Sequence, residues 1–105
     1  MRFLETPIFT REVLNLLQDE EYHSLQLALL LRPEQGVLIP GSGGLRKFRW
    51  GQKAKGKRGG CRVIYYWDRK HETFYMLLVY PKSKQEDLSP AQIKVLSKLV
   101  KEEFK

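Results

Sequence analysis

Residues 62–80 have the sequence RVIYYWDRKHETFYMLLVY, which constrains the fold more strongly than any other part of the chain. Residues 62–67 are mostly β-branched or aromatic, and residues 73–80 form an apolar run, so both segments are predicted to be strands. The polar residues 68–72 between them are predicted to form a turn. Because this connection is short, we expect the two strands to pair antiparallel.

Two further strands are predicted upstream of this pair. Residues 45–50 (LRKFRW) are expected to form the neighbouring strand, which a glycine- and lysine-rich loop at 51–60 joins to it. Residues 33–44 contain two prolines and four glycines and are predicted to be a loop. A short first strand is predicted at residues 3–5.

Helix-start signals flank these strands. Thr6 is a candidate cap for a helix that begins at Pro7, and Asp19 is a candidate cap for a second helix that ends near Leu31. Ser89, followed by proline and with Gln92 three residues later, predicts a capped C-terminal helix. The expected order is β-α-α-β-β-β-α. It describes one α+β domain over residues 1–105, with an antiparallel sheet packed by an N-terminal helical hairpin and a C-terminal helix.

The distribution of charge indicates a polyanionic partner. The net charge is +7, and no acidic residue lies between Glu34 and Asp68. A stretch of this length without acids produces a local positive field, whereas a solvated surface usually mixes both signs. Eight basic residues lie within it: Arg46, Lys47, Arg49, Lys53, Lys55, Lys57, Arg58 and Arg62.

Strand alternation divides the first of these bases between two faces. Phe48 is the obvious core residue of its strand, so Arg46 shares the inward face, while Lys47 and Arg49 are expected to point outward together. They would lie about 7 Å apart, a spacing suited to gripping one phosphate. Arg62 opens the next strand, and its planar guanidinium can bind phosphate through two hydrogen bonds.

Other residues are candidates for docking RNA. The loop lysines could contact phosphates or simply solvate a hairpin tip, and tyrosines could stack on bases, although aromatic side chains in strands more often belong to a core. Lys82 and Lys84, just after the last strand, could complete the cationic rim. The candidate RNA- or ribosome-binding residues are Arg46, Lys53, Lys55, Lys57, Arg58, Tyr65 and Tyr80.

The sequence does not support several other kinds of site. Cys61 is the single cysteine and cannot form an internal disulfide, and no apolar run is long enough to cross a membrane. The first residues lack the apolar core of a signal peptide, so we expect a cytoplasmic protein. His23 and His71 are far apart and no cluster has metal-ligand spacing, so neither a metal nor another cofactor is predicted. Catalysis, if present, would depend on basic side chains, as phosphodiester cleavage by an attacking 2′-hydroxyl permits.

At this point the chain resembles a known family. The stretch GLRKFR at 44–49, the run KRGGCRVIYY at 57–66 and the element order look like the RelE/ParE superfamily of type II toxins, most closely the HigB-like branch of the RelE group. The resemblance covers nearly the whole chain. Its most specific motif is glycine-x-arginine-x-x-tyrosine from Gly60 to Tyr65, downstream of the basic strand.

The resemblance implies an activity and a set of roles. Such toxins are typically metal-independent endoribonucleases that cut messenger RNA in the ribosomal A site, inhibit translation and are blocked by a cognate antitoxin. By position, Lys47 and Arg49 match a candidate base and a phosphate ligand, and Arg62 matches the arginine that stabilises the transition state. Lys82 or Lys84 falls where a basic residue protonates the leaving group.

One departure and two alternatives stay open. Some RelE toxins carry a tyrosine after the last-strand basic cluster, whereas residues 85–89 here are QEDLS, so Tyr80 or Tyr65 would have to replace it. A gyrase inhibitor of the ParE type shares the fold, although that branch generally lacks the Lys47, Arg49 and Arg62 set. A non-catalytic RNA-binding module would use the same lysines and leave RNA intact.

Overall fold

A computed structural model describes residues 1–51 and 60–104 of the chain. The predicted docking residues Lys53, Lys55, Lys57 and Arg58 lie outside the described residues.

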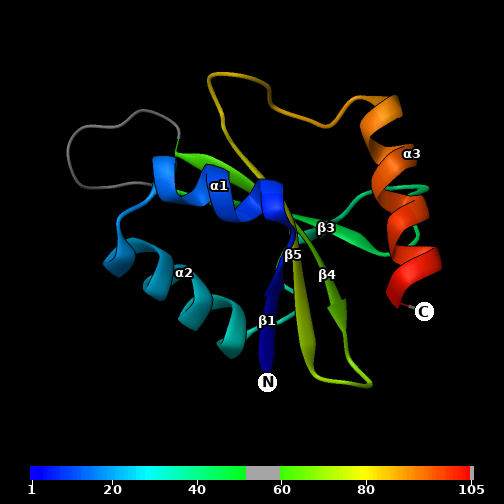
Figure 1. Ribbon diagram of the computed structural model, residues 1–105, viewed down its shortest axis with the longest axis horizontal. Helices are drawn as coiled ribbons and strands as arrows, with labels where there is room; N and C mark the ends of the chain where they lie inside the picture. Colours follow the sequence, from blue (N-terminus) through cyan, green and yellow to red (C-terminus); the bar gives the residue numbers. More distant parts are fainter. Residues whose placement is uncertain (52–59, 105) are drawn as a thin grey trace.

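The described strands form a five-stranded mixed sheet in the order β1-β5-β4-β3-β2 (Figure 1). β3 (Leu45–Trp50), β4 (Cys61–Asp68) and β5 (Thr73–Pro81) form the predicted antiparallel meander. β1 (Arg2–Glu5) instead pairs with β5 in parallel, so the prediction of a purely antiparallel sheet is wrong. A short turn at residues 69–72 imposes antiparallel pairing on β4 and β5, whereas β1 reaches the edge of β5 from a distant part of the chain.

A fifth strand, β2 (Val37–Leu38), lies in the segment predicted to be a loop. It pairs antiparallel with β3, with Val37 opposite Lys47 and Leu38 opposite Arg46. The described element order is therefore β-α-α-β-β-β-β-α, and the α+β class is as predicted.

The helix boundaries follow local capping. α1 (Pro7–Leu16) begins after Thr6, whose side chain accepts a hydrogen bond from the Phe9 backbone, and α3 (Pro90–Leu99) begins with the predicted capping box of Ser89 and Gln92. A π-helical turn, Val100–Phe104, extends α3. α2 (Asp19–Leu31) is capped by Gln18, so the prediction of Asp19 as the cap is one residue late. Glu21 accepts a hydrogen bond from the Gln18 backbone at 2.9 Å and completes the cap from inside the helix.

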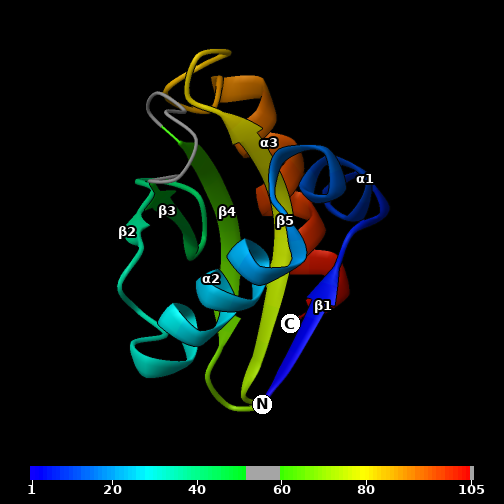
Figure 2. The same ribbon diagram turned by 90° about the vertical axis from the view of Figure 1, so that its left-hand side faces the viewer.

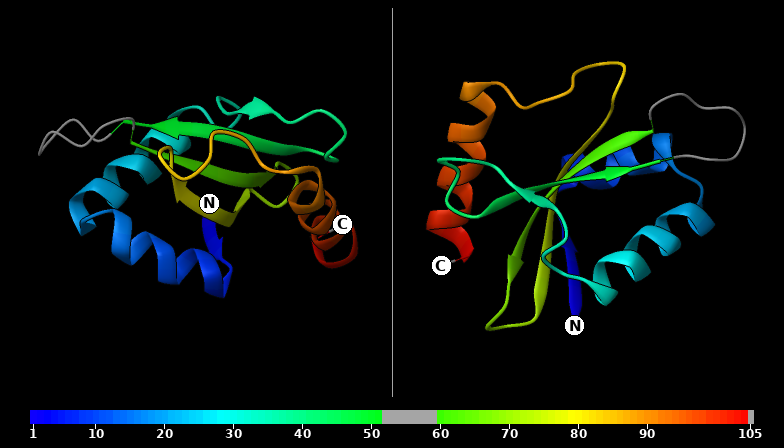
Figure 3. Two further views of the ribbon diagram at one scale, coloured as in Figure 1. Left: turned by 90° about the horizontal axis from the view of Figure 1, so that it is seen from above. Right: turned by 180° about the vertical axis from the view of Figure 1, so that it is seen from behind.

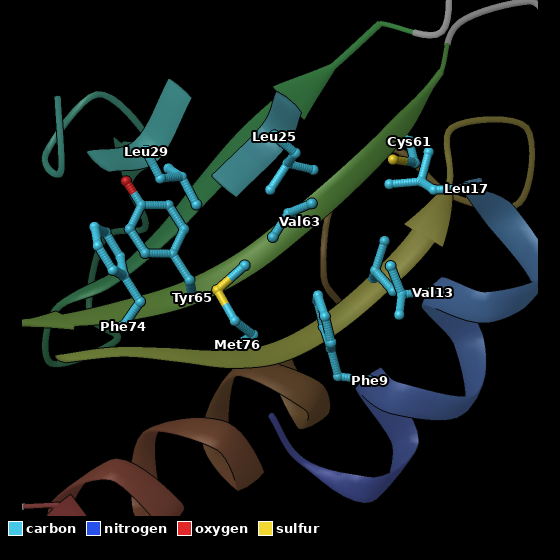
Figure 4. Close-up of a cluster of buried hydrophobic side chains, with 11 residues drawn as sticks. Phe9, Val13, Leu17, Leu25, Leu29, Cys61, Val63, Tyr65, Phe74 and Met76 are labelled. Atoms are coloured by element: carbon cyan, nitrogen blue, oxygen red, sulfur yellow. The ribbon is translucent and has the colours of Figure 1, made fainter. Parts of the chain in front are cut away.

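The helices cover opposite faces of the sheet, as Figures 2 and 3 show. α1 and α2 pack on one face over a core that includes Phe9, Leu25, Val63 and Met76 (Figure 4). We call this the hairpin face. α3 packs on the other face over a smaller core, which we call the α3 face. Its buried members are Leu45, Ile64, Leu77, Tyr80, Leu88 and Val100.

A β-bulge in β5 changes which side chains reach the α3 face. Ile64 pairs with Leu78 and the next residue of β4, Tyr65, pairs with Met76, so Leu77 is the extra residue. Both Leu77 and Leu78 consequently pack on the α3 side, and the alternation of β5 is reversed beyond them. This reversal places Tyr80 on the α3 face, opposite Arg62.

Candidate functional site

Two adjacent strands bring three cationic side chains together on the α3 face. Phe48 packs against the hairpin core, so Lys47 and Arg49 share the opposite face, as strand alternation predicts. Arg49 lies directly across from Arg62 in the β3–β4 register. We call Lys47, Arg49 and Arg62 the cation cluster.

One carboxylate lies at the centre of the cation cluster. Glu86 belongs to the connection between β5 and α3, which arches over this end of the molecule (Figure 1). Its two oxygens accept hydrogen bonds from Nε and one terminal nitrogen of Arg62, each at 3.1 Å. The same carboxylate lies 3.5 Å from the Lys47 ammonium and 3.4 Å from an Arg49 nitrogen. Asp87 adds a second carboxylate, which forms an ion pair with Lys47.

The members of the cation cluster differ in exposure. The side chains of Arg62 and Lys47 are only 7% and 11% exposed, whereas that of Arg49 is 63% exposed. Hydrogen bonds from Arg62, together with its charge and those of Lys47 and Arg49, lower the pKa of Glu86 to about 2. The site therefore holds an ionised carboxylate over two largely covered cations.

Tyr80 helps to hold the backbone of Glu86 in place. Its hydroxyl donates a hydrogen bond to the backbone oxygen of Glu86 at 3.3 Å. Burial and the nearby carboxylates of Asp87 and Glu86 raise its pKa, so the phenol keeps its proton. Tyr80 is 5% exposed, and its ring is packed into the α3-side core with no face open to a base. We therefore assign Tyr80 to positioning Glu86 and withdraw the stacking role considered from sequence.

Two other predicted RNA-binding residues lie on the hairpin side. Tyr65 is fully buried, and its hydroxyl donates to the Pro33 backbone oxygen and accepts from the Gly36 backbone nitrogen. Its ring cannot stack on a base, so the tyrosine of the glycine-x-arginine-x-x-tyrosine motif is a core residue. Arg46 points away from the cation cluster and donates to the backbone oxygens of Glu34 and Gly36. We therefore remove Tyr65 from the candidate site, whereas RNA or ribosome binding by the half-buried Arg46, away from the cation cluster, stays a prediction.

The remaining predicted residues lie at the rim. Lys82 and Lys84 are exposed on the same connection as Glu86, outside the contacts that this carboxylate makes. Their assignment to the leaving group stays a prediction.

Sequence reasoning missed Glu86 and Asp87. A signal was present, because two acids lie in the connection that follows the last strand, in a chain whose strands carry three bases at the facing end. Charge complementarity suggests pairing, but only the folded connection shows which bases these acids meet.

Within residues 1–51 and 60–104, no group of three or more histidine, cysteine, aspartate or glutamate side chains is arranged to hold a metal ion. No helix in this part of the chain has the length and apolar character needed to cross a bilayer.

A family model described as "RelE toxin of RelE / RelB toxin-antitoxin system" matches residues 2–105. The chain belongs to the RelE toxin family. It is thus the toxin component of a type II toxin–antitoxin system, and the family implies a cognate antitoxin as its partner. RelE-family toxins are known endoribonucleases, and the cation cluster brings together three basic strand residues of this member of the family.

Proposed function

We propose that this RelE-family toxin is a ribosome-dependent, metal-independent endoribonuclease that cuts messenger RNA and so inhibits translation. We place its active site at the cation cluster. The ribosome, messenger RNA and ribosomal RNA are the proposed partners besides the antitoxin, and HigB-like toxins are the proposed nearest branch.

The observation that carries the proposal is the convergence of Lys47, Arg49 and Arg62 on a single carboxylate. The Glu86 carboxylate is a monoanion with two acceptor oxygens, as is the non-bridging part of an RNA phosphodiester. Arginine binds carboxylate and phosphate with the same two-pronged geometry. The donors that hold the Glu86 carboxylate are therefore of the kind that a phosphodiester would use.

The proposed reaction needs charge stabilisation and two proton transfers. The 2′-oxygen forms a bond to phosphorus as its proton leaves, and the bond from phosphorus to the 5′-oxygen breaks as that oxygen gains a proton. The products are a 2′,3′-cyclic phosphate and a free 5′-hydroxyl. Arg62 and Arg49 would stabilise the additional negative charge on the phosphoryl oxygens in the transition state. Lys47 is the candidate base, and Lys82 or Lys84 the candidate acid.

Replacing Arg62 tests the proposal. Arg62→Ala should lower message cleavage by about 100- to 1000-fold, because it removes a held donor pair from the phosphate site. Cleavage is measured by mapping message 5′ ends in a purified translation reaction, with the 2′,3′-cyclic phosphate on the upstream fragment as a further readout. Arg69→Ala is the matched control, since Arg69 is exposed on the β4–β5 turn at the far end of β4 and carries the same charge.

The same preparations separate the alternatives. Growth inhibition by wild-type protein with unchanged message 5′ ends would contradict the proposal. Inhibition of DNA supercoiling would then indicate a gyrase inhibitor, and RNA binding without cleavage would indicate a binding module.

A further inference from the structure

The contacts of Glu86 place it where a substrate phosphate would have to bind. Its carboxylate oxygens occupy the Nε and terminal nitrogen donors of Arg62 on one side of the guanidinium. The same carboxylate lies within 3.5 Å of both Lys47 and Arg49. A phosphate that used these three residues together would need the space that Glu86 fills.

Because Arg62 is buried, Glu86 restricts the access of a phosphate to it. The Arg62 side chain is 7% exposed, while the Glu86 side chain that meets it is 42% exposed. Access to Arg62 from solvent on this side therefore passes through Glu86. Lys47, at 11% exposed, is in ion pairs with both Glu86 and Asp87.

The charge balance also favours displacement by an anion. Three positive charges in the cation cluster meet the two negative charges of Glu86 and Asp87, which leaves one net positive charge. Withdrawal of Glu86 would leave two, and an incoming phosphate would restore the contacts that Arg62 loses. In this exchange Arg62 loses one anionic hydrogen-bond acceptor and gains another. Its buried charge is therefore not left without a partner.

The connection that carries Glu86 permits such a movement. Residues 82–88 form turns and bends, outside any helix or strand. Their backbone is held by Tyr80, which binds the Glu86 oxygen, and by the buried side chain of Leu88. Rotation of the partly exposed Glu86 side chain would release the two donors of Arg62 that it occupies, and rotations of exposed side chains are fast.

Glu86 is poorly suited to act as the general base. Its pKa of about 2 means that the carboxylate binds a proton only weakly at neutral pH. Moreover, both of its oxygens accept hydrogen bonds from Arg62. The geometry agrees better with an anion that competes for the site than with one that removes a proton.

We propose that Glu86 is an internal competitor of the RNA phosphate, holding the cation cluster in the free toxin until a phosphodiester displaces it. The inference rests on the proposed function only in taking RNA phosphate as the ligand. It makes the 82–88 connection a latch over the active site, with Asp87 as a weaker second contact at Lys47 alone.

The test is direct binding of a fluorescein-labelled single-stranded oligonucleotide with 2′-O-methyl groups throughout, which cannot be cleaved by 2′-attack. Anisotropy titrations at fixed ionic strength would compare wild-type toxin with Glu86→Gln, which removes the charge and keeps the shape. We expect Glu86→Gln to bind about tenfold more tightly, as expected when one hydrogen-bonded competing charge is lost. Asp87→Asn should give a smaller gain.

Two controls isolate the latch from a general change in charge. Glu102→Gln removes the same charge from the exposed C-terminal end of the helix, and it should leave affinity near that of wild type. In an Arg62→Ala background the gain from Glu86→Gln should shrink, because Arg62 supplies the two hydrogen-bond donors that Glu86 occupies. If Glu86→Gln is insoluble, Glu86→Asp provides the same test, since its shorter side chain retreats from Arg62 and should give a partial gain.

The proposal is overturned if Glu86→Gln binds no more tightly than Glu102→Gln. It is also overturned if Glu86→Gln binds more weakly, since Glu86 would then organise the arginines for the ligand. These outcomes are independent of the nuclease proposal. If Glu86→Gln binds more tightly but the wild-type toxin cleaves no message, the latch is retained and the nuclease is rejected. If the wild-type toxin cleaves message but Glu86→Gln binds no more tightly, the nuclease is retained and the latch is rejected.

Discussion

Gly60 holds the backbone two residues before Arg62 in a conformation that other residues rarely adopt. Its φ is 59°, and a Cβ placed there would lie 2.0 Å from the backbone oxygen of Trp50. Gly60→Ala should therefore destabilise the protein by about 1–3 kcal/mol or more and displace Arg62 from the cation cluster. Urea unfolding and message cleavage would measure the two effects.

Gly51, across the same hairpin, offers a matched comparison. Among the described residues, none lies within 4 Å of a Cβ at Gly51, so Gly51→Ala should leave stability and cleavage close to wild type. Equal effects of the two substitutions would show that the close approach at Gly60 is unimportant for the site.

Tyr65 makes a different prediction because it is a core residue that carries a buried polar group. Its hydroxyl bonds the Gly36 nitrogen at 3.0 Å and the Pro33 oxygen at 2.7 Å, and Tyr65→Phe leaves the Gly36 N–H without this acceptor. We expect a loss of about 1–3 kcal/mol in the free energy of unfolding. Cleavage per folded molecule should not change.

Tyr66→Phe is the control for this loss. Tyr66 lies on the α3 face, and its hydroxyl forms no hydrogen bond with another described residue, so its removal should cost little stability. A drop in cleavage by Tyr65→Phe at full folding would instead return Tyr65 to the RNA-contacting residues.

At the scale of the element, the features that could be predicted from sequence are those set by interactions between residues close together in the chain. The faces of Lys47 and Phe48 follow from strand alternation, and the starts of α1 and α3 follow from capping residues within three positions. The cap of α2 shows the limit of this approach, because both Gln18 and Asp19 precede the same apolar pattern and the choice depends on the backbone path.

Elements defined by distant partners could not be predicted in this way. β2 has two residues and no periodicity of its own. It forms because its backbone pairs with that of β3. The bulge at Leu77 leaves an ordinary apolar run in the sequence, yet it decides that Tyr80 lies beside Arg62. The position of Glu86 depends on how the 82–88 connection folds back across β3, which no local pattern encodes.

At the scale of the whole molecule, the two faces of the sheet are covered unequally. The hairpin face is closed by α1 and α2 over the larger core (Figure 4), whereas α3 covers only part of its face. The cation cluster lies on the α3 face, beside the connection that leads into this helix. Leaving three like charges together on the sheet is unfavourable, so Glu86 also contributes to the stability of the free fold.

This contribution predicts a pH dependence of global stability. Folding lowers the pKa of Glu86 from 4.5 to about 2, so the stabilisation is present above about pH 4.5 and is lost as the pH falls toward 2. Wild type should therefore exceed Glu86→Gln in free energy of unfolding at pH 6, and the difference should shrink between pH 4.5 and 2. The pKa of Asp68 is also lowered, because hydrogen bonds from His71 outweigh its burial, but Asp68 is common to both proteins and cancels in the difference. Urea unfolding at pH 6, 4 and 3 measures the difference in free energy of unfolding between wild type and Glu86→Gln directly. A difference that stayed constant over this range would mean that the ion pairs of Glu86 do not stabilise the free toxin in solution, whereas a shrinking difference would place the carboxylate on the cation cluster before any RNA is present.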